Sequence, residues 1–181
     1  LVCSSLHWTY QIEYFRKNYQ AIWFDYRGHH RSEEPKDLGT LTVEAFARDV
    51  ECVLKELKVE KAVLLGHSMG VNVVLDYYRQ YPERVAGMVL ANGTAKRPLE
   101  TMFHSNAMQA GFKFLDQAYR RIPKLVEAIW KLQKLSPLTR PLVTFGGFNP
   151  HLTAREDIEL YIQQVAEMNP KIFLNLIRNY D

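Results

Sequence analysis

The chain has 181 residues, 47% of them hydrophobic and 24% charged, with a formal net charge of +3. Such a composition is typical of one globular domain with a single core, and it excludes a disordered or fibrous protein. Basic residues are spread among acidic ones, which argues against a nucleic acid partner, and no apolar run approaches the roughly 20 residues that cross a bilayer.

The first part of the chain alternates between strand-like and helix-like patterns. Residues 19–26 are predicted to form a strand that leads into a polar, glycine-containing loop at residues 25–30. From Thr42 to Leu57, apolar residues recur on one helical face, and Thr42 is a suitable N-cap. This segment is predicted to be an amphipathic helix that crosses between strands of a parallel sheet.

The most informative motif lies at residues 66–70, with the sequence Gly-His-Ser-Met-Gly. It follows an apolar run at residues 61–65 and precedes a helical pattern that reaches about Tyr81. A serine at the tip of a sharp strand-to-helix turn needs a strained backbone, and glycines two positions on either side let the strand and the helix pass closely. We interpret the motif as a nucleophile elbow. Residues 85–90 are predicted to form the next buried strand.

After residue 93 the strand patterns stop and helical patterns dominate. Helices are predicted at residues 98–121, 123–135, 155–168 and 171–180, with breaks at Pro123, Ser136-Pro137, Gly146-Gly147 and Asn169-Pro170. The change predicts two parts, an α/β core over residues 1–93 and a helical cap over residues 94–181. The expected fold class is α/β, a partial parallel sheet with helices on both faces and an all-helical cap.

Three stretches of the core resemble the α/β-hydrolase family, in particular its members with a helical cap. Residues 1–8 are similar to the segment after the family's His-Gly oxyanion loop. Residues 25–32 are similar to its Asp-x-Arg-Gly-His-Gly-x-Ser loop, and residues 66–70 to its elbow. The resemblance is close up to about residue 94, and the helical remainder matches in position and type only. His30 stands where the family usually has glycine.

The resemblance implies roles for particular residues. Ser68 would be the nucleophile that attacks an acyl carbonyl, and the backbone N–H of Met69 would be one oxyanion donor. By the same alignment, Leu1 would supply the second donor N–H. His67, Asn92 and Trp130 are expected to line the substrate pocket, and packing roles are the alternative for His67 and for the aromatic residues of the cap.

The family's catalytic acid and base histidine follow the cap, beyond the last residue of this sequence. None of the six histidines occupies the family's base position: His7, His29, His30, His67, His104 and His151. We therefore expect this chain to be a fragment of a hydrolase that is inactive by itself. The family also has a strand between the one ending at Asp25 and the elbow strand, so these two are not expected to pair directly.

The implied reaction is hydrolysis of a carboxylic ester through a Ser68 acyl-enzyme. Other serine-dependent reactions of this fold stay open, namely carbon–carbon bond hydrolysis, haloperoxidation and acyl transfer, and so does a non-catalytic binding role. Family members that open epoxides or remove halogens use an aspartate at the elbow, so Ser68 argues against both activities.

The expected partner is a small, apolar acyl substrate, because aromatic residues are frequent in the predicted cap. Cys3 and Cys52 are the only cysteines, and neither their number nor their spacing fits a metal site or a disulfide framework. No cofactor and no metal are therefore expected. A cytoplasmic location is the default expectation.

Overall fold

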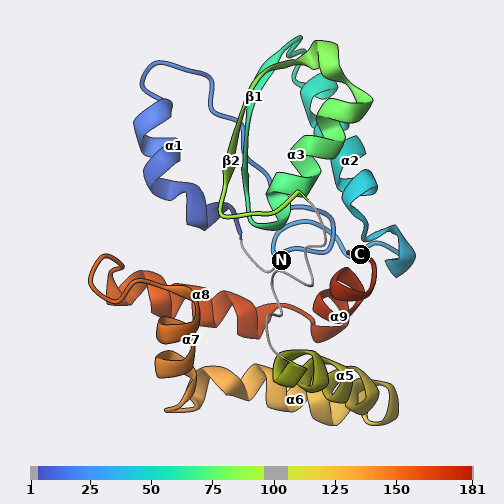
Figure 1. Ribbon diagram of the computed structural model, residues 1–181, viewed down its shortest axis with the longest axis vertical. Coiled ribbons are helices and arrows are strands. Elements are labelled where there is room, and N and C mark those ends of the chain that lie inside the picture. The colour runs from blue at the N-terminus through green and yellow to red at the C-terminus, as the bar shows by residue number, and fades with distance from the viewer. Residues whose placement is uncertain (1–3, 96–105, 181) are drawn as a thin grey trace. The chain divides into compact units, whose positions relative to one another are not determined.

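The computed structural model describes residues 4–95 and 106–180. The chain divides into two compact units, each made of segments that lie far apart in the sequence (Figure 1). The sheet unit contains residues 35–114 and 174–181, and the helical unit contains residues 2–34 and 115–173. Leu1, the predicted second oxyanion donor, lies outside the described residues. The division into a core and a cap at residue 94 stays a prediction.

The sheet unit is built around two parallel strands. β1 (Ala62–His67) pairs with β2 (Val85–Ala91), and Leu65 lies opposite Val89 in the register. α3 (Met69–Gln80) contacts both strands and, with the short 3-10 turn η3 (Pro82–Arg84), connects them. A parallel pair needs such a crossover connection. The predicted order of strand, helix and strand is confirmed.

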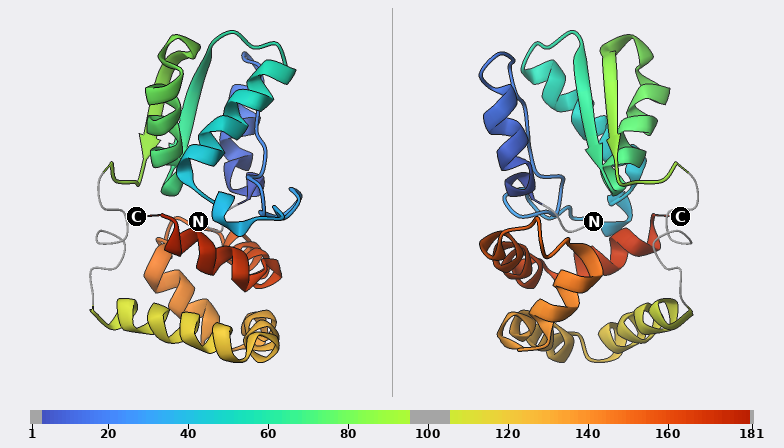
Figure 2. Two further views of the ribbon diagram at one scale, coloured as in Figure 1. Left: turned by 90° about the vertical axis from the view of Figure 1, so that its right-hand side faces the viewer. Right: turned by 60° about the vertical axis from the view of Figure 1, so that its left-hand side comes forward.

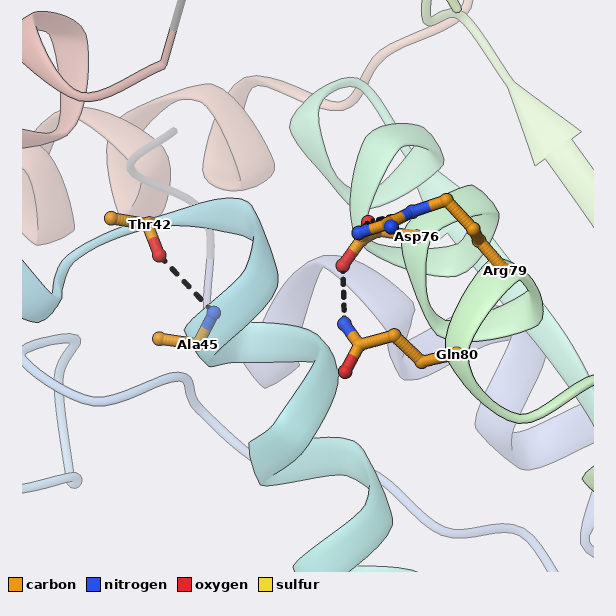
Figure 3. Close-up of polar contacts among 5 residues, drawn as sticks. All are labelled: Thr42, Ala45, Asp76, Arg79 and Gln80. Carbon is orange, nitrogen blue, oxygen red and sulfur yellow. Dashed lines mark hydrogen bonds and ion pairs between the residues drawn. The ribbon is translucent and has the colours of Figure 1, made fainter.

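α2 (Val43–Glu56) packs against α3 and confirms the predicted amphipathic helix. Its N-cap is Thr42, whose Oγ1 accepts a hydrogen bond from the Ala45 N–H at 3.2 Å (Figure 3). The cap satisfies one of the donors that every helix start leaves without an intrahelical partner. On α3, Asp76 accepts hydrogen bonds from Arg79 and Gln80 one turn further on, as Figure 3 also shows.

The interior of the sheet unit is apolar and draws on distant parts of the chain. Phe46, Val73 and Tyr77 are fully buried, and so is Leu174 in the second half of α9 (Pro170–Arg178). Burying a side chain of this kind contributes roughly 1.5–3 kcal/mol. Asn179 adds polar contacts, because its Nδ2 donates to the carbonyl oxygens of Leu38 and Leu41, each at 3.2 Å. Leu38 lies in the 3-10 turn η2 (Leu38–Thr40).

Among the described residues of the sheet unit, Glu51 is the one charged group that is buried. Its Oε2 accepts hydrogen bonds from the Tyr77 hydroxyl at 2.6 Å and the Arg84 Nε at 3.2 Å, and Lys55 lies 3.3 Å from Oε1. Burial opposes ionisation of Glu51, but the hydrogen bonds from Tyr77, Lys55 and Arg84 outweigh it, so the pKa lies below its ordinary value. Burial, together with the hydrogen bond to Glu51, raises the pKa of Tyr77 to about 12. The cluster therefore holds a carboxylate and a neutral phenol at neutral pH.

The helical unit contains short helices and no strand among its described residues. The elements in chain order are η1 (Ser5–Trp8), α1 (Thr9–Phe15), the end of α5 (Asn106–Arg121), α6 (Pro123–Leu132), η4 (Gln133–Leu135), α7 (Thr139–Gly147) and α8 (Arg155–Glu167). Figure 2 shows the later helices from two further directions. α6 with η4, α8 and α9 confirm three predicted helices. The fourth is confirmed over residues 106–121, since residues 96–105 lie outside the described part.

α7 has no counterpart among the predicted helices. It contains Pro141 and ends in Gly146-Gly147, residues that predict a break rather than a helix. Pro141 lies in the first turn, where the missing N–H leaves no intrahelical hydrogen bond unmade. The helix contacts α8 and η4. Tertiary packing has therefore overridden weak local propensity.

The strand predicted at residues 19–26 is wrong, since residues 20–26 form no regular element. A strand is defined by its ladder to a neighbour, and the described residues contain one ladder, between β1 and β2. The apolar run at residues 21–24 therefore has no partner strand. It does not pair with β1 either, in line with the expected separation of these two segments.

The loop that follows is held by its own polar groups. The Asp25 carboxylate accepts a hydrogen bond from the Ser5 N–H at 2.9 Å, and the Asp25 carbonyl accepts one from the Ser32 hydroxyl. Gly28 has φ 76° and His30 has φ 40°, both in the left-handed region. His30 stands where the family that residues 25–32 resemble has glycine, and a Cβ in that conformation is strained. Glycine suits this position because it adopts the left-handed region freely. His30 adopts the same conformation at a cost in strain energy.

Candidate active site

The candidate site is the junction between β1 and α3. Ser68 occupies it with φ 55° and ψ −121°, a backbone conformation that is strained for any residue with a Cβ. Two hydrogen bonds hold the junction on either side. The Ser68 N–H donates to the Ala91 carbonyl at 3.0 Å, and the Ser68 carbonyl accepts from the Val71 N–H at 3.0 Å. The serine is thereby fixed to the end of β2 as well as to its own helix.

Two glycines make this geometry possible. A Cβ on Gly66 would lie 2.4 Å from the Gly70 carbonyl oxygen, and one on Gly93 would lie 2.7 Å from the Ser68 carbonyl oxygen. Non-bonded carbon and oxygen atoms do not approach so closely, so both positions exclude a side chain. The role of Gly66 follows from the motif. Gly93 lies outside the motif, as the second residue after β2.

Met69 begins α3 and is buried, with 4% of its surface exposed. As the first helical residue, it has an N–H without an acceptor inside the helix. The positive end of the helix dipole lies at the same place. The start of α3 can therefore stabilise a negative charge that forms beside Ser68.

His67 and Asn92 lie beside the elbow at the carboxyl ends of the two strands. His67 is opposite Ala91 in the register, and Asn92 follows directly with φ 49°, a conformation that asparagine tolerates. Partial burial lowers the pKa of His67, so its ring is neutral at pH 7. Ligands of open α/β sheets bind at this edge, which keeps both residues as candidates for the pocket.

Trp130 lies in the helical unit, where its ring is engaged in packing. Its indole N–H donates to the Val165 carbonyl at 2.8 Å, and its ring centroid lies 5.4 Å from that of Phe173. Its place in a substrate pocket stays a prediction. The same holds for the catalytic roles of Ser68, Met69 and Leu1.

Asn72 and Tyr180 support the elbow, but no local sequence pattern predicts this role. Asn72, in the first turns of α3, donates from Nδ2 to the Thr94 carbonyl at 2.9 Å and accepts at Oδ1 from the Tyr180 hydroxyl at 2.7 Å. Burial raises the pKa of Tyr180 to about 12. Asn72 thus ties the elbow helix to the segment after β2 and to the residues after α9. Only the folded chain brings these partners together.

The described residues supply no partner for the Ser68 hydroxyl. No described histidine or carboxylate donates to it or accepts from it, and it does not cap α3. His7 stacks edge-on against Tyr161 in the helical unit, and His29 is buried in the loop described above. The described histidine, cysteine and acidic side chains form no group that could hold a metal ion. Within the same residues, no helix is long and apolar enough to cross a membrane.

A separate polar cavity of about 370 Å³ lies in the helical unit, between the loop at residues 25–34 and the end of α8. Ser4 and Gln164 are both buried at its wall, and the Ser4 hydroxyl donates to Gln164 Oε1 at 2.8 Å. Ser68 is not among the residues that line it.

Comparison with known proteins gives one family and several relatives. A family model described as alpha/beta hydrolase fold matches residues 2–178. Epoxide hydrolase 3 of Xenopus tropicalis is 23% identical over 181 residues, which cover 95% of this chain and 48% of that protein. Protein ABHD8 of Homo sapiens is 31% identical over 99 residues, which cover 54% of this chain and 23% of that protein. The chain thus spans about a fifth to a half of the curated relatives it matches.

Solved structures agree on the fold. An epoxide hydrolase from Bacillus megaterium superposes with a TM-score of 0.70 at 21% identity, covering 98% of this chain and 61% of the other. An esterase from Thermogutta terrifontis superposes with a TM-score of 0.66 at 23% identity, covering 96% and 58%. At these identities the likeness concerns the fold, and the two neighbours bear names of different reactions.

Proposed function

Because the chain belongs to the α/β hydrolase fold family, we propose that the complete protein hydrolyses carboxylic esters through an acyl-enzyme on Ser68. The observation that carries the proposal is the backbone of Ser68, with φ 55° and ψ −121° between a strand and a helix. A residue held in such a conformation costs of order 1–3 kcal/mol, and strain of this kind clusters at functional sites. The two side-chain-free positions at Gly66 and Gly93 maintain it.

In the proposed mechanism, Ser68 Oγ attacks the carbonyl carbon of the ester. The carbonyl oxygen becomes an oxyanion, which the Met69 N–H at the start of α3 stabilises, with the N–H of Leu1 as the proposed second donor. The alcohol leaves with a proton, and the acyl group stays on Ser68. Water then attacks this acyl-enzyme through a second oxyanion, which releases the acid and restores the serine.

A serine hydroxyl is a weak nucleophile unless a neighbouring base removes its proton. No described histidine or carboxylate hydrogen-bonds to Ser68, so the described residues alone do not complete the machinery. We accordingly assign the activity to the complete protein. The chain of residues 1–181 by itself is expected to react slowly or not at all.

Epoxide hydrolysis is the second candidate, because two of the relatives above bear that name. An elbow carboxylate that opens an epoxide forms an ester, and water can cleave this ester at its carbonyl carbon. A serine would form an ether, which offers water no carbonyl to attack. Ser68 therefore favours ester hydrolysis, since only the acyl-enzyme has a route to turnover.

The proposed substrate is a small ester with an apolar acyl group. His67 and Asn92 are proposed to line its pocket because they lie at the sheet edge beside Ser68. Trp130 is proposed to contribute an apolar wall from the cap, which is proposed to span residues 94–181. Substitution of these three residues should change KM across a series of acyl chain lengths more than it changes kcat.

The test is labelling of the complete protein with a fluorophosphonate probe, combined with turnover of p-nitrophenyl esters. Ser68→Ala should abolish labelling and lower kcat/KM by at least about a thousandfold. Ser136→Ala is the matched control, because Ser136 is exposed in the helical unit, and it should label normally. Labelling that persists in Ser68→Ala would contradict the nucleophile.

An epoxide such as styrene oxide separates the two candidates. Ester turnover without diol formation supports the proposal. Diol formation that survives in Ser68→Ala would assign the reaction to another nucleophile. A complete protein that is neither labelled nor active would favour a binding role on the same fold.

A further inference from the structure

α6 leaves most of its apolar residues in solvent. Val126 is its one fully buried residue. Four larger apolar residues at and along the helix are 48–60% exposed, and we call them the α6 stripe: Ile122, Leu125, Ile129 and Leu132. Soluble monomers rarely leave such a patch open, and a patch of this kind usually marks a site of contact with a protein or a membrane.

The four residues of the stripe lie on one side of the helix. At 100° per residue, they fall within an arc of about 80°. Val126 and Trp130 lie on the neighbouring side, which faces the rest of the helical unit through the bond from Trp130 to Val165. The stripe is thus a continuous apolar strip parallel to the helix axis.

The exposed apolar surface continues into the next elements. Leu135 in η4 is 72% exposed, and Leu138, Leu142 and Phe145 are 75–81% exposed along α7. Those three residues, spaced by four and three positions, also share one helical side. α6, η4 and α7 follow one another in the helical unit (Figure 1). Residues 122–145 therefore contain eight large apolar side chains that are exposed to solvent.

The charges around the stripe are almost all positive. Residues 119–146 contain six basic residues and one acidic residue, Glu127, which accepts a hydrogen bond from Tyr119. The basic residues are Arg120, Arg121, Lys124, Lys131, Lys134 and Arg140. With a net charge of +3 for the whole chain, this segment holds more positive charge than the chain as a whole.

Four of these cations form no ion pair with any described residue: Arg121, Lys124, Lys131 and Lys134. Arg120 pairs with Asp116, and Arg140 with Glu159. Lys124 and Lys131 lie on one side of α6, roughly 80–100° around the helix from Leu132. A long lysine side chain beside an apolar strip can bury its stem while its ammonium stays at a polar surface.

From the exposed stripe and its unpaired cations we propose that the α6 stripe docks on the surface of an anionic lipid bilayer. An amphipathic helix with large apolar residues on one side and lysines beside them lies in the membrane interface. Anionic lipid headgroups would supply the negative charges that the segment lacks. The proposal does not depend on the activity of Ser68.

A second copy of this chain is the competing occupant, and the charges disfavour it. A twofold interface would place the same surface on both sides. The cations that flank one stripe would then face those of the other, with Glu127 as the one acidic residue in each copy of residues 119–146. Like charges brought together in this way weaken association, whereas an anionic bilayer neutralises them.

The experiment is sedimentation of the complete protein with vesicles of phosphatidylcholine alone and of phosphatidylcholine with about one-third phosphatidylglycerol. Binding should favour the anionic vesicles and weaken as salt is raised, because salt screens exposed charges. Leu125→Gln with Ile129→Gln should lower the partition coefficient roughly tenfold or more, since two apolar side chains leave the interface. Lys124→Gln with Lys131→Gln should remove much of the preference for anionic vesicles.

Leu57→Gln is the matched control. Leu57 is 47% exposed and lies in the sheet unit just after α2, so its loss should leave vesicle binding unchanged. Hydrogen exchange gives a readout that does not depend on variants. Anionic vesicles should protect the amides of residues 122–135 more than those of α8.

Three results would overturn the proposal. The first is equal binding to neutral and anionic vesicles, or no binding to either. The second is binding that the stripe variant retains. The third is a dimer in solution, measured by sedimentation equilibrium without lipid, that the stripe variant dissociates, because that result would assign the surface to a second copy.

Discussion

α3 and α6 are both amphipathic helices, but they differ in what covers their apolar side. On α3, Val73 and Tyr77 are fully buried within the sheet unit. On α6, Val126 is buried while Leu125 and Ile129 are 53% and 60% exposed. The difference shows that an apolar stripe in the sequence predicts a helix but does not predict which part of the molecule, if any, covers that stripe. The α3 stripe belongs to a core that holds the elbow in place, whereas the α6 stripe is exposed to solvent.

The largest loss of stability is expected for a substitution at the packed junction between β1 and α3. Gly66→Ala places a Cβ 2.4 Å from the backbone oxygen of Gly70, and neither the strand nor the helix can move without disturbing the elbow. We expect the free energy of unfolding to fall by more than about 3 kcal/mol. Urea denaturation measures it.

Gly111→Ala is the matched control, because nothing lies within 4 Å of a Cβ at that position of α5. Alanine is the better helix former, so this variant should gain about 0.5–1 kcal/mol. Equal effects of the two substitutions would show that the elbow is not closely packed.

A pair of leucine substitutions tests the contrast in burial directly. Leu54→Ala on α2, where the side chain is 5% exposed, should cost about 3 kcal/mol through lost burial and a cavity. Leu132→Ala on α6, where it is 58% exposed, should change the free energy of unfolding by less than about 0.5 kcal/mol. A large loss for Leu132→Ala would mean that α6 is covered in solution by a part of the same molecule.

Tyr77→Phe tests the buried polar cluster against pH. The variant leaves Glu51 without its shortest hydrogen bond, so we expect a loss of about 1–2 kcal/mol at pH 7. The folded pKa of Glu51 is lowered, so its contribution to stability is present above its ordinary value of 4.5 and disappears as the pH falls through the folded value. The gap between wild type and variant should therefore narrow below pH 4.5. A difference in the free energy of unfolding that stays constant from pH 7 to pH 3 would show that ionised Glu51 does not cause it.

The smallest effects concern strained backbone in each unit. His30 in the helical unit and Lys58 after α2 in the sheet unit have φ 40° and 56°. Glycine adopts this region freely, so His30→Gly and Lys58→Gly should each gain about 1 kcal/mol in thermal or chemical unfolding. Arg48→Gly in the interior of α2 is the control and should lose about 1 kcal/mol. A loss in either test variant would show that its side chain contributes more than the strain costs.

The features that local sequence determines were predictable. The spacing of apolar residues predicts α2, α3 and α8. Thr42 is predicted as the N-cap of α2, and residues 66–70 predict the elbow with its glycine at position 66. Each of these depends on residues within a few positions of one another. They are also the parts in which periodicity, capping and turn chemistry agree.

What was missed depends on distant partners. The apolar run at residues 21–24 resembles a strand but has no ladder among the described residues. α7 tolerates Pro141 in its first turn and packs on α8, although its local sequence predicts a break. The contacts of Asn72 with Thr94 and Tyr180 join residues that no local pattern connects. Exposure of the α6 stripe is likewise a property of the folded molecule, since the same spacing on α3 is buried.

Each unit is assembled from segments that the other interrupts, and this has a consequence for the order of folding. The sheet unit includes the buried Leu174, which the ribosome adds only after residues 115–173 of the other unit. A nascent chain that has reached Phe173 therefore holds a sheet unit with part of its interior missing. Contacts of such long sequence separation form slowly because a large loop must close first. During synthesis, the interior of the sheet unit stays incomplete until α9 has emerged, and apolar surface exposed in this interval makes the chain prone to aggregation.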